Sequence, residues 1–308
     1  MPQPNLVLIM TDTQGADCVG ADRHDPRLMT PCIDSLAAQG AWCERAYTTS
    51  PLCTPARSGL FTGILSQRSG AWTNSLALSQ NVRHLGQWFR ELGYRTAYMG
   101  KWHLDGHDYF GSGRCPDGWE SDYWYDGRNY LEELTPAQRR YWRREVTYES
   151  LKRLGIDADF TWAGRCVQRA TRFLESTRAG DQPFLLVVSF DEPHHPFACP
   201  ATDIEPFIDL RFDIGPSFDD PLSDKPSHYR AWQGGHARQR QHHMPMYYGC
   251  NHFVDRCIGQ VVQQVDALAR GETYVVYTSD HGDLRGAHGL NGKGPAPFEE
   301  ITRIPLTV

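Results

Sequence analysis

Lysine is scarce in this 308-residue sequence: only four of its 31 basic residues are lysines, so the other 27 are arginines. The sequence also lacks an overall basic charge. Its net charge of −6 excludes a general nucleic-acid-binding protein, which needs a basic surface. It has no apolar run long enough to cross a membrane, and its N-terminus lacks the pattern of a signal peptide. We therefore predict a cytoplasmic protein that binds neither nucleic acid nor membranes.

Paired cysteines are absent as well. The nine cysteines are scattered without a Cys-x-x-Cys pair, which argues against a disulfide framework or a zinc ribbon. One of them, Cys53 in "SPLCTPARSGLFTG", stands at the head of a predicted helix beside Pro55 and Arg57. Only three residues separate Cys53 from Arg57, which excludes the Cys-x₅-Arg loop of protein tyrosine phosphatases. Four interpretations of Cys53 stay open: a buried small hydrophobic residue, a metal ligand, a nucleophile and a site of covalent modification.

Apolar runs of strand length alternate with amphipathic stretches of helical length. The predicted buried strands lie in residues 5–12, 95–103, 181–197 and 272–283. Predicted helices lie in residues 30–40, about 163–177 and 252–271, and the first has Thr30 as its N-cap, Pro31 at its first position and Gly40 past its end. This alternation predicts an α/β fold with a mostly parallel sheet flanked by helices. In such folds the ligand site lies at the carboxyl ends of the strands.

Two irregular stretches interrupt the alternation. Residues 105–145 are rich in Gly, Asp, Trp and Tyr, and residues 200–245 are rich in Pro, His, Asp and Arg. We interpret both as long insertions in one domain over residues 1–308, because such insertions more often cover or line a site than fold separately. The final residues, "RIPLTV", have the pattern of a strand that is just beginning, so we expect the chain to be a fragment of a longer polypeptide.

Acidic residues follow two of the predicted strands. Asp12 ends the first strand, and Asp280 and His281 in "TSDHGD" follow the last. A carboxylate beside an imidazole suits a divalent cation such as Ca²⁺, Mg²⁺ or Mn²⁺. An acid at a strand end also commonly caps a helix or solvates a loop, and this alternative stays open for Asp12.

Two of the four lysines lie in glycine-flanked loops near these acids. Lys101 and His103 follow a predicted strand in "YMGKWHLDGH", and Lys293 lies in "GLNGKGP". This arrangement indicates a pocket that binds an oxyanion, although a surface lysine and a packed histidine are the alternatives. In "DEPHHPF", prolines flank His194 and His195, and the fixed backbone could hold one imidazole toward a leaving group as a general acid.

"CTPAR" followed by "SGLFTG" resembles the Cys-x-Pro-x-Arg signature of the sulfatases. "GYRTAYMGKWHL" resembles the second signature of that family, and the acid after the first strand, the Pro-His-x-Pro element and "SDHGD" recur in the family's order. The resemblance covers nearly the whole chain and is nearest to bacterial cytoplasmic-type sulfatases. It implies an alkaline-phosphatase-like α/β fold and the hydrolysis of sulfate esters. It also implies a smaller C-terminal subdomain, which we expect to be missing here.

The resemblance further implies a covalent modification and a role for each candidate residue. Cys53 would be oxidised to formylglycine by a separate maturation enzyme; one hydroxyl of its metal-bound hydrate would attack sulfur, and the other would later lose a proton so that sulfate leaves. The implied metal is Ca²⁺ as first choice, with Mg²⁺ or Mn²⁺ as alternatives, and its implied ligands are Asp12, Asp280, His281 and residue 53. The resemblance implies that Arg57 orients the hydrate and that His103 assists it. It implies that Lys101 and Lys293 hold sulfate oxygens, that His194 acts on the leaving oxygen, and that Asn74 contacts the substrate.

The sequence departs from the family pattern at two places. Thr13 follows Asp12 where many sulfatases have a second Asp, and His281 stands where many have Asn. A histidine at that position occurs in the choline-sulfatase and phosphonate-monoester-hydrolase branches. We therefore expect a small sulfated substrate, with a carbohydrate sulfate as one option. Two alternatives stay open: a hydrolase of phosphonate or phosphate esters with the same site, and an inactive truncated remnant that binds a metal and an anion.

Overall fold

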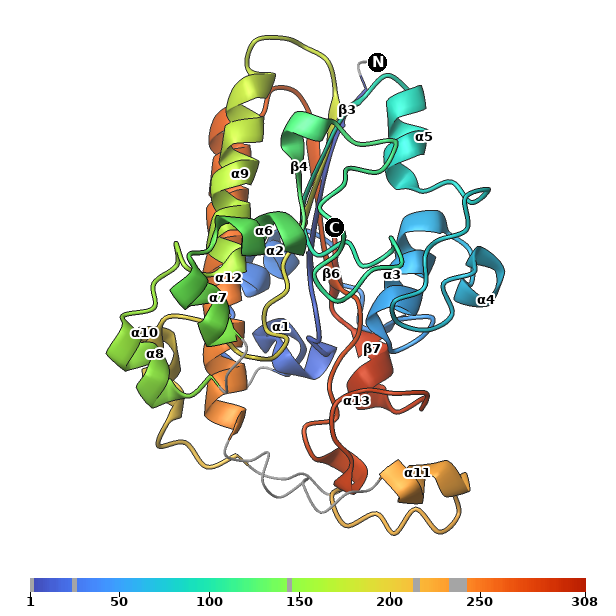
Figure 1. Ribbon diagram of the computed structural model, residues 1–308, viewed down its shortest axis with the longest axis vertical. Coiled ribbons are helices and arrows are strands. Elements are labelled where there is room, and N and C mark those ends of the chain that lie inside the picture. The colour runs from blue at the N-terminus through green and yellow to red at the C-terminus, as the bar shows by residue number, and fades with distance from the viewer. Residues whose placement is uncertain (1–2, 24–26, 143–145, 213–216, 233–242) are drawn as a thin grey trace.

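A six-stranded sheet runs through the middle of the molecule (Figure 1), in the order β4-β3-β5-β1-β6-β8. The computed structural model describes residues 3–23, 27–142, 146–212, 217–232 and 243–308. The strands of the sheet are β1 (Asn5–Thr11), β3 (Arg95–Gly100), β4 (Trp124–Tyr125), β5 (Phe184–Ser189), β6 (Thr273–Ser279) and β8 (Leu306–Thr307). β8 pairs antiparallel with β6, and the other neighbouring pairs are parallel. This confirms the predicted α/β fold with a mostly parallel sheet.

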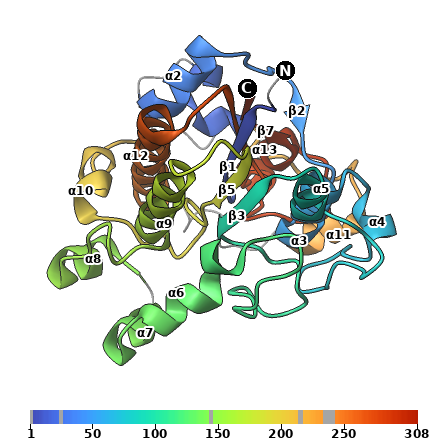
Figure 2. The same ribbon diagram turned by 90° about the horizontal axis from the view of Figure 1, so that it is seen from above.

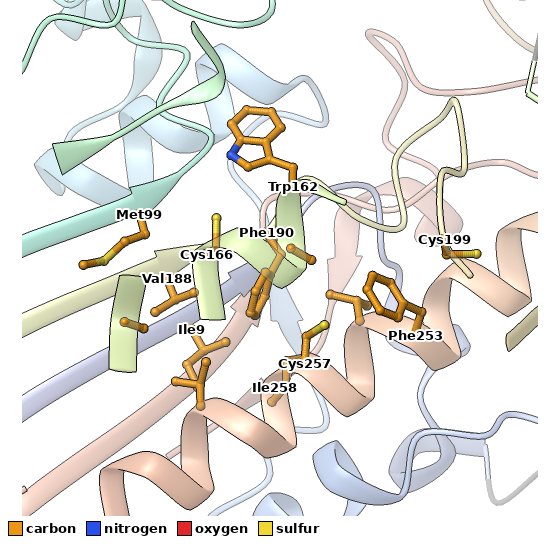
Figure 3. Close-up of a cluster of buried hydrophobic side chains, with 14 of the residues drawn as sticks. Ile9, Met99, Trp162, Cys166, Val188, Phe190, Cys199, Phe253, Cys257 and Ile258 are labelled. Atoms are coloured by element: carbon orange, nitrogen blue, oxygen red, sulfur yellow. The ribbon is translucent and has the colours of Figure 1, made fainter. Parts of the chain in front are cut away.

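Strands β1, β3 and β5 are buried on both faces over almost their whole length, as their continuous apolar sequences predict, whereas the first half of β6 is partly exposed. Successive side chains of β1 point to opposite faces: Val7 and Ile9 belong to one hydrophobic cluster, and Leu8 and Met10 belong to another. Figure 3 shows part of the first cluster, in which Ile9 lies near Cys257 and Ile258 of the long helix α12 (Met244–Leu268).

Helices cover both faces of the sheet. Seen from above (Figure 2), α2, α9 and α12 lie on one side, and α3 and α5 lie on the other. The helices other than α12 are α1 (Gly20–Arg23), α2 (Pro31–Gln39), α3 (Cys53–Thr62), α4 (Ser66–Ser69), α5 (Leu85–Glu91), α6 (Gly127–Glu133), α7 (Pro136–Trp142), α8 (Tyr148–Leu154), α9 (Trp162–Thr177), α10 (Ala201–Ile204), α11 (Ser227–Trp232) and α13 (Glu299–Thr302). A small antiparallel sheet pairs β2 (Ala46–Tyr47) with β7 (Arg303–Ile304).

The start of α2 differs from its prediction. Pro31 is the first helical residue and the helix ends before Gly40, as expected, but the Thr30 side chain does not cap it. The buried carboxylate of Asp255 on α12 instead accepts hydrogen bonds from the backbone N–H groups of Cys32 and Ile33, at 3.1 and 2.8 Å. A cap that comes from a helix more than 200 residues away cannot be recognised from the local sequence.

Both insertions contribute side chains to the main hydrophobic cluster, and the second also contributes to a smaller one. Tyr130 of α6 in the first insertion is fully buried in the cluster that lines α9 and α12. In the second, Ile204 of α10 is buried in that cluster, while Tyr229 of α11 packs with Leu290 in a smaller one. Residues 143–145, 213–216 and 233–242 of these stretches lie outside the described residues. The assignment of all 308 residues to one domain stays a prediction.

None of the helices in the described ranges is both long and apolar enough to pass through a bilayer. The cytoplasmic location stays a prediction. All nine cysteines lie in the described part of the chain, and none of them forms a disulfide.

Candidate active site

Four loops that follow parallel strands bring the candidate residues together. Asp12 follows β1, Lys101 follows β3, His194 lies in the loop after β5, and Asp280 follows β6. These strands are neighbours in the sheet, in the order β3-β5-β1-β6. Their carboxyl ends therefore form one edge, which is where open α/β sheets place their ligand sites.

Asp12, Cys53, Asp280 and His281 form a buried group of potential metal ligands. One donor atom from each lies within 4.8 Å of the others. His281 Nε2 is 3.5 Å from Asp280 Oδ1 and 3.3 Å from Cys53 Sγ. Two carboxylates, one imidazole and the side chain of residue 53 are donors that suit a divalent cation. The predicted ligand set therefore fits such an ion.

The electrostatics of the two carboxylates favour a cation between them. Burial, followed by the neighbouring charge of Asp12, raises the pKa of Asp280 to about 7. Burial opposes ionisation of Asp12 too, but the ammonium groups of Lys101 and Lys293 prevail and lower its pKa well below the usual range. Two buried acids in mutual contact repel each other when both are ionised, and a bound cation would relieve that repulsion.

Arg57 ties the two acids together. Its side chain is fully buried, and Nη2 lies 2.9 Å from Asp12 Oδ2 while Nε lies 3.0 Å from Asp280 Oδ2. Nη1 donates to the Lys101 carbonyl oxygen and to Ser189 Oγ, at 2.5 and 2.8 Å. Since Arg57 lies one helical turn after Cys53 on α3, the guanidinium fixes the start of that helix against both acids.

Cys53 is the first residue of α3, and its thiol lies among charges of both signs. Sγ is 3.8 Å from Lys101 Nζ and 3.8 Å from Asp12 Oδ1. Burial and the Asp12 carboxylate oppose ionisation of the thiol, but Lys101, Lys293 and His281 together lower the Cys53 pKa well below its usual range. The position at the positive end of the helix dipole also favours negative charge there.

The two lysines predicted to form an oxyanion pocket lie on either side of Asp12. Lys101 is fully buried, with Nζ 2.8 Å from Asp12 Oδ2 and 3.2 Å from Asp191 Oδ1. Lys293 Nζ lies 3.5 Å from Asp12 Oδ1 and donates to Thr13 Oγ1 at 3.0 Å. Burial opposes the charge of Lys101, but the neighbouring Asp12 and Asp191 raise its pKa, so the ammonium group carries its charge. Thr13, which replaces a second acid, thus connects Lys293 to the metal-ligand group.

His103 and Asn74 lie around the second residue of α3. Thr54 Oγ1 donates to the His103 carbonyl oxygen at 2.9 Å, and Asn74 Oδ1 accepts from the Thr54 backbone N–H at 3.0 Å. His103 is buried in a left-handed conformation, with φ at +57°, and its Nδ1 has no hydrogen-bond partner among the described residues. The side-chain amide oxygen of Asn74 therefore holds the helix start, and its contact with a substrate stays a prediction.

His194 lies in the same cluster, and its surroundings include residues that the sequence interpretation missed. Its Nδ1 is 3.0 Å from the Tyr109 hydroxyl, which donates to Asp191 Oδ1. Burial, followed by the positive charges of Lys293 and Lys101, lowers the pKa of His194 to about 3. Asp191 lies two residues after the end of β5, so its position near a strand end would have been a usable signal, whereas Tyr109 lies in the first insertion.

The neighbouring Glu192 is a buried acid without a cation beside it. Its Oε1 accepts from the Ala163 backbone N–H at 3.1 Å, at the start of α9, and its Oε2 has no partner among the described residues. Burial, followed by the Asp191 charge, raises the pKa of Glu192 to about 8. The carboxyl group is therefore neutral in the folded protein at neutral pH.

Replacing Glu192 by Gln should make folding stability less sensitive to pH. In the unfolded chain the Glu192 carboxyl ionises near pH 4.5, whereas in the folded protein it keeps its proton up to about pH 8. Between those values unfolding releases a proton, so the wild type loses stability as the pH rises, by on the order of 5 kcal/mol in total. Urea unfolding at pH 5, 7 and 9 should show Glu192→Gln gaining on the wild type as the pH increases. Glu175→Gln, at an exposed position of α9, should show the same pH dependence of the unfolding free energy as the wild type. If Glu192→Gln also showed the wild-type pH dependence, the raised pKa of Glu192 would be contradicted.

Comparisons with known proteins were made for the whole chain. The family model described as Sulfatase matches residues 4–308. The Escherichia coli protein named "Uncharacterized sulfatase YidJ" is 48% identical over 313 residues, which cover 100% of this chain and 63% of that protein. The "Ulvan-active sulfatase" of Formosa agariphila is 28% identical, over 99% of this chain and 56% of its own length. The chain thus spans less than two thirds of these curated relatives.

Solved structures have the same fold. A YidJ structure from Bacteroides fragilis is 27% identical with a TM-score of 0.72, covering 99% of this chain and 68% of that one. The phosphonate monoester hydrolase of Agrobacterium radiobacter is 21% identical with a TM-score of 0.75, and the match covers 99% of this chain and 68% of that one. These neighbours confirm the alkaline-phosphatase-like fold.

Proposed function

We propose that this chain, which belongs to the sulfatase family, hydrolyses sulfate esters and releases inorganic sulfate and an alcohol. One observation carries the proposal: Cys53 begins α3 within contact distance of a lysine, an acid and an imidazole that come from three different strand ends. A thiol kept only for packing would not require these charged partners. The arrangement suits a site where a modified residue 53 meets an anionic substrate.

The residues available for a metal are Asp12, Asp280, His281 and residue 53. A divalent cation bound there would polarise the sulfate ester and stabilise negative charge on oxygen. We propose Ca²⁺, with Mg²⁺ or Mn²⁺ as alternatives, because two carboxylates and one imidazole accept all three ions. Reconstitution of the chelated protein with each ion tests the choice by the activity that it restores.

Residue 53 would act as formylglycine, made from the Cys53 thiol by a maturation enzyme. One hydroxyl of the hydrated aldehyde would attack sulfur, and deprotonation of the second would release sulfate and restore the aldehyde. A plain thiol or serine hydroxyl lacks this second group and would remain as a stable ester. Arg57 holds the start of α3 and both acids in place, and His103 would assist the hydrate.

The substrate's charge would be held by the lysines. Lys101 and Lys293 bring one ammonium group to each carboxylate oxygen of Asp12, where sulfate oxygens would accept their hydrogen bonds. His194 would protonate or polarise the oxygen of the departing alcohol. Asn74 would contact the substrate through the part of its amide that does not hold Thr54. The alcohol is proposed to be a carbohydrate.

A second candidate function is the hydrolysis of phosphonate or phosphate esters. The fold shared with a phosphonate monoester hydrolase supports it, and His281 is compatible with it, because a histidine at this position occurs in the phosphonate-monoester-hydrolase branch as well as in the choline-sulfatase branch. A tetrahedral oxyanion pocket with two lysines would accept either group. The alternative of an inactive remnant predicts one of two results: Cys53 stays a thiol in cells that contain a maturation enzyme, or the modified chain hydrolyses no ester.

The test compares matched substrates on protein co-expressed with a formylglycine-generating enzyme. Peptide mass spectrometry first establishes whether the Cys53 thiol has become an aldehyde. Turnover of p-nitrophenyl sulfate is then compared with that of a p-nitrophenyl phosphonate ester, followed by a panel of sulfated sugars. Hydrolysis of the sulfate esters is the expected result. Activity on the phosphonate alone would overturn the proposal, and modified protein without activity on any ester would favour the remnant.

A further inference from the structure

We propose that Tyr109, supported by Asp191, is the positioning residue that sets the orientation of the His194 imidazole. This inference rests on the proposed sulfatase function, in which His194 acts on the leaving oxygen. Tyr109 comes from the first long insertion and not from a strand end. Its hydroxyl lies 3.0 Å from His194 Nδ1, and the two rings are in contact, with centroids 5.1 Å apart.

Asp191 determines the direction of the hydrogen bonds. Its side chain is buried, and Oδ1 lies 3.2 Å from the Lys101 ammonium. Burial raises the pKa of Asp191, and Lys101 opposes that rise. Because Oδ1 faces the Lys101 ammonium, which can only donate, this oxygen is an acceptor, and the Tyr109 hydroxyl donates its single proton to it. Burial and the Asp191 charge also raise the pKa of Tyr109 well above its usual value, which keeps the phenol protonated.

The proton on His194 Nδ1 follows from these directions. With its own proton used on Asp191, the Tyr109 oxygen is an acceptor toward the ring. The carbonyl oxygen of His195, 2.6 Å from the same nitrogen, is also an acceptor. Two acceptors around Nδ1 require that this nitrogen carry a proton in either protonation state of the ring. The Nε2 atom is then the one left for the substrate.

The Tyr109 ring also lies next to the proposed sulfate-binding lysine. Lys101 Nζ lies 3.8 Å from the centre of the Tyr109 ring and 3.8 Å from Cys53 Sγ. Tyr109 therefore contacts both the histidine proposed to act on the leaving oxygen and a lysine proposed to hold sulfate. Loss of its hydroxyl would remove one of the two acceptors at His194 Nδ1 and loosen the orientation of the imidazole, whereas the ring would still pack against Lys101.

The first test is spectroscopic and does not need the matured enzyme. Protein that retains the Cys53 thiol is labelled with ¹⁵N-histidine, and the His194 signals are assigned by comparison with His194→Gln. We expect the wild type to show the Nδ1-protonated form, and Tyr109→Phe to show a mixture of ring forms with a faster-exchanging Nδ1 proton. Tyr94→Phe, which removes only a hydroxyl bonded to the Pro4 carbonyl oxygen, is the matched control. An unchanged His194 signal in Tyr109→Phe would overturn the inference.

The second test uses matured protein and a series of sulfate esters with increasingly poor leaving groups. Misorienting His194 should matter little for p-nitrophenyl sulfate, whose leaving group needs no proton. It should lower kcat by about 10–100-fold for unactivated alkyl or sugar sulfates, since general acid catalysis supplies at least that much. An equal loss across the series, or none, would contradict the positioning role. A wild type inactive on every ester while the spectroscopic difference persists would instead reject the proposed function and leave the ring assignment standing.

Discussion

Replacing Cys53 by alanine should abolish the hydrolysis of sulfate esters. The variant lacks the only side-chain atom at the start of α3 from which the nucleophile can be made, while Asp12, Lys101 and His281 remain around the vacated position. Removal of a nucleophile on which catalysis depends lowers kcat by about 10⁴-fold or more. The measurement is kcat/KM for p-nitrophenyl sulfate on protein co-expressed with a maturation enzyme.

Two matched variants make this result specific. Cys43→Ala removes an exposed thiol and should keep wild-type turnover. Cys53→Ser, expressed without a maturation enzyme, keeps one hydroxyl at the site and should transfer at most one sulfate. It would then remain as a sulfate ester, which intact-mass measurement detects. Full turnover by Cys53→Ala would show that the reaction does not use residue 53. It would contradict both proposals that require formylglycine, namely the hydrolysis of sulfate esters and that of phosphonate or phosphate esters.

The sheet and its active edge could be predicted because each strand carries its own signal. The continuous apolar runs before Asp12 and Asp280 are the pattern of strands buried on both faces, and both runs are strands of the parallel sheet. Since carboxyl ends of parallel strands share one edge, the polar residues that follow them had to lie together. The Cys-x-Pro-x-Arg segment resembles the sulfatase signature, and this resemblance placed Cys53 in the same predicted site.

Contacts between distant segments could not be predicted in the same way. The pairing of Tyr109 with His194 joins a loop without regular periodicity to a strand end 85 residues later, and no local pattern encodes it. The cap that Asp255 provides for α2 is of the same kind. For Arg57 the resemblance implied a role toward residue 53, which stays a prediction, and the contacts of its buried guanidinium with both Asp12 and Asp280 were not predicted. Such roles depend on packing geometry that only the folded chain defines.

Replacing Arg57 by methionine should destabilise the fold severely. The variant preserves much of the apolar stem of the side chain but leaves two buried carboxylates, those of Asp12 and Asp280, without their shared guanidinium. Breaking a buried ion pair by removing one partner typically costs about 3–5 kcal/mol, because the remaining charge is neither paired nor hydrated. Urea unfolding of chelated protein at pH 8 should show a loss of that size. Arg68→Met, at an exposed position of the neighbouring α4, should lose less than about 0.5 kcal/mol.

The loss caused by Arg57→Met should also shrink as the pH falls. The pKa of Asp280 is about 7 even with Arg57 present, because burial and the Asp12 charge disfavour its ionised form. Without the guanidinium that pKa rises further, so below pH 7 the Asp280 carboxyl takes up a proton and no longer needs a cation. The difference in unfolding free energy between wild type and variant should therefore be smaller at pH 5.5 than at pH 8. A difference that stays constant over this range, or that is below about 1 kcal/mol at pH 8, would mean that Arg57 is not what neutralises the two acids.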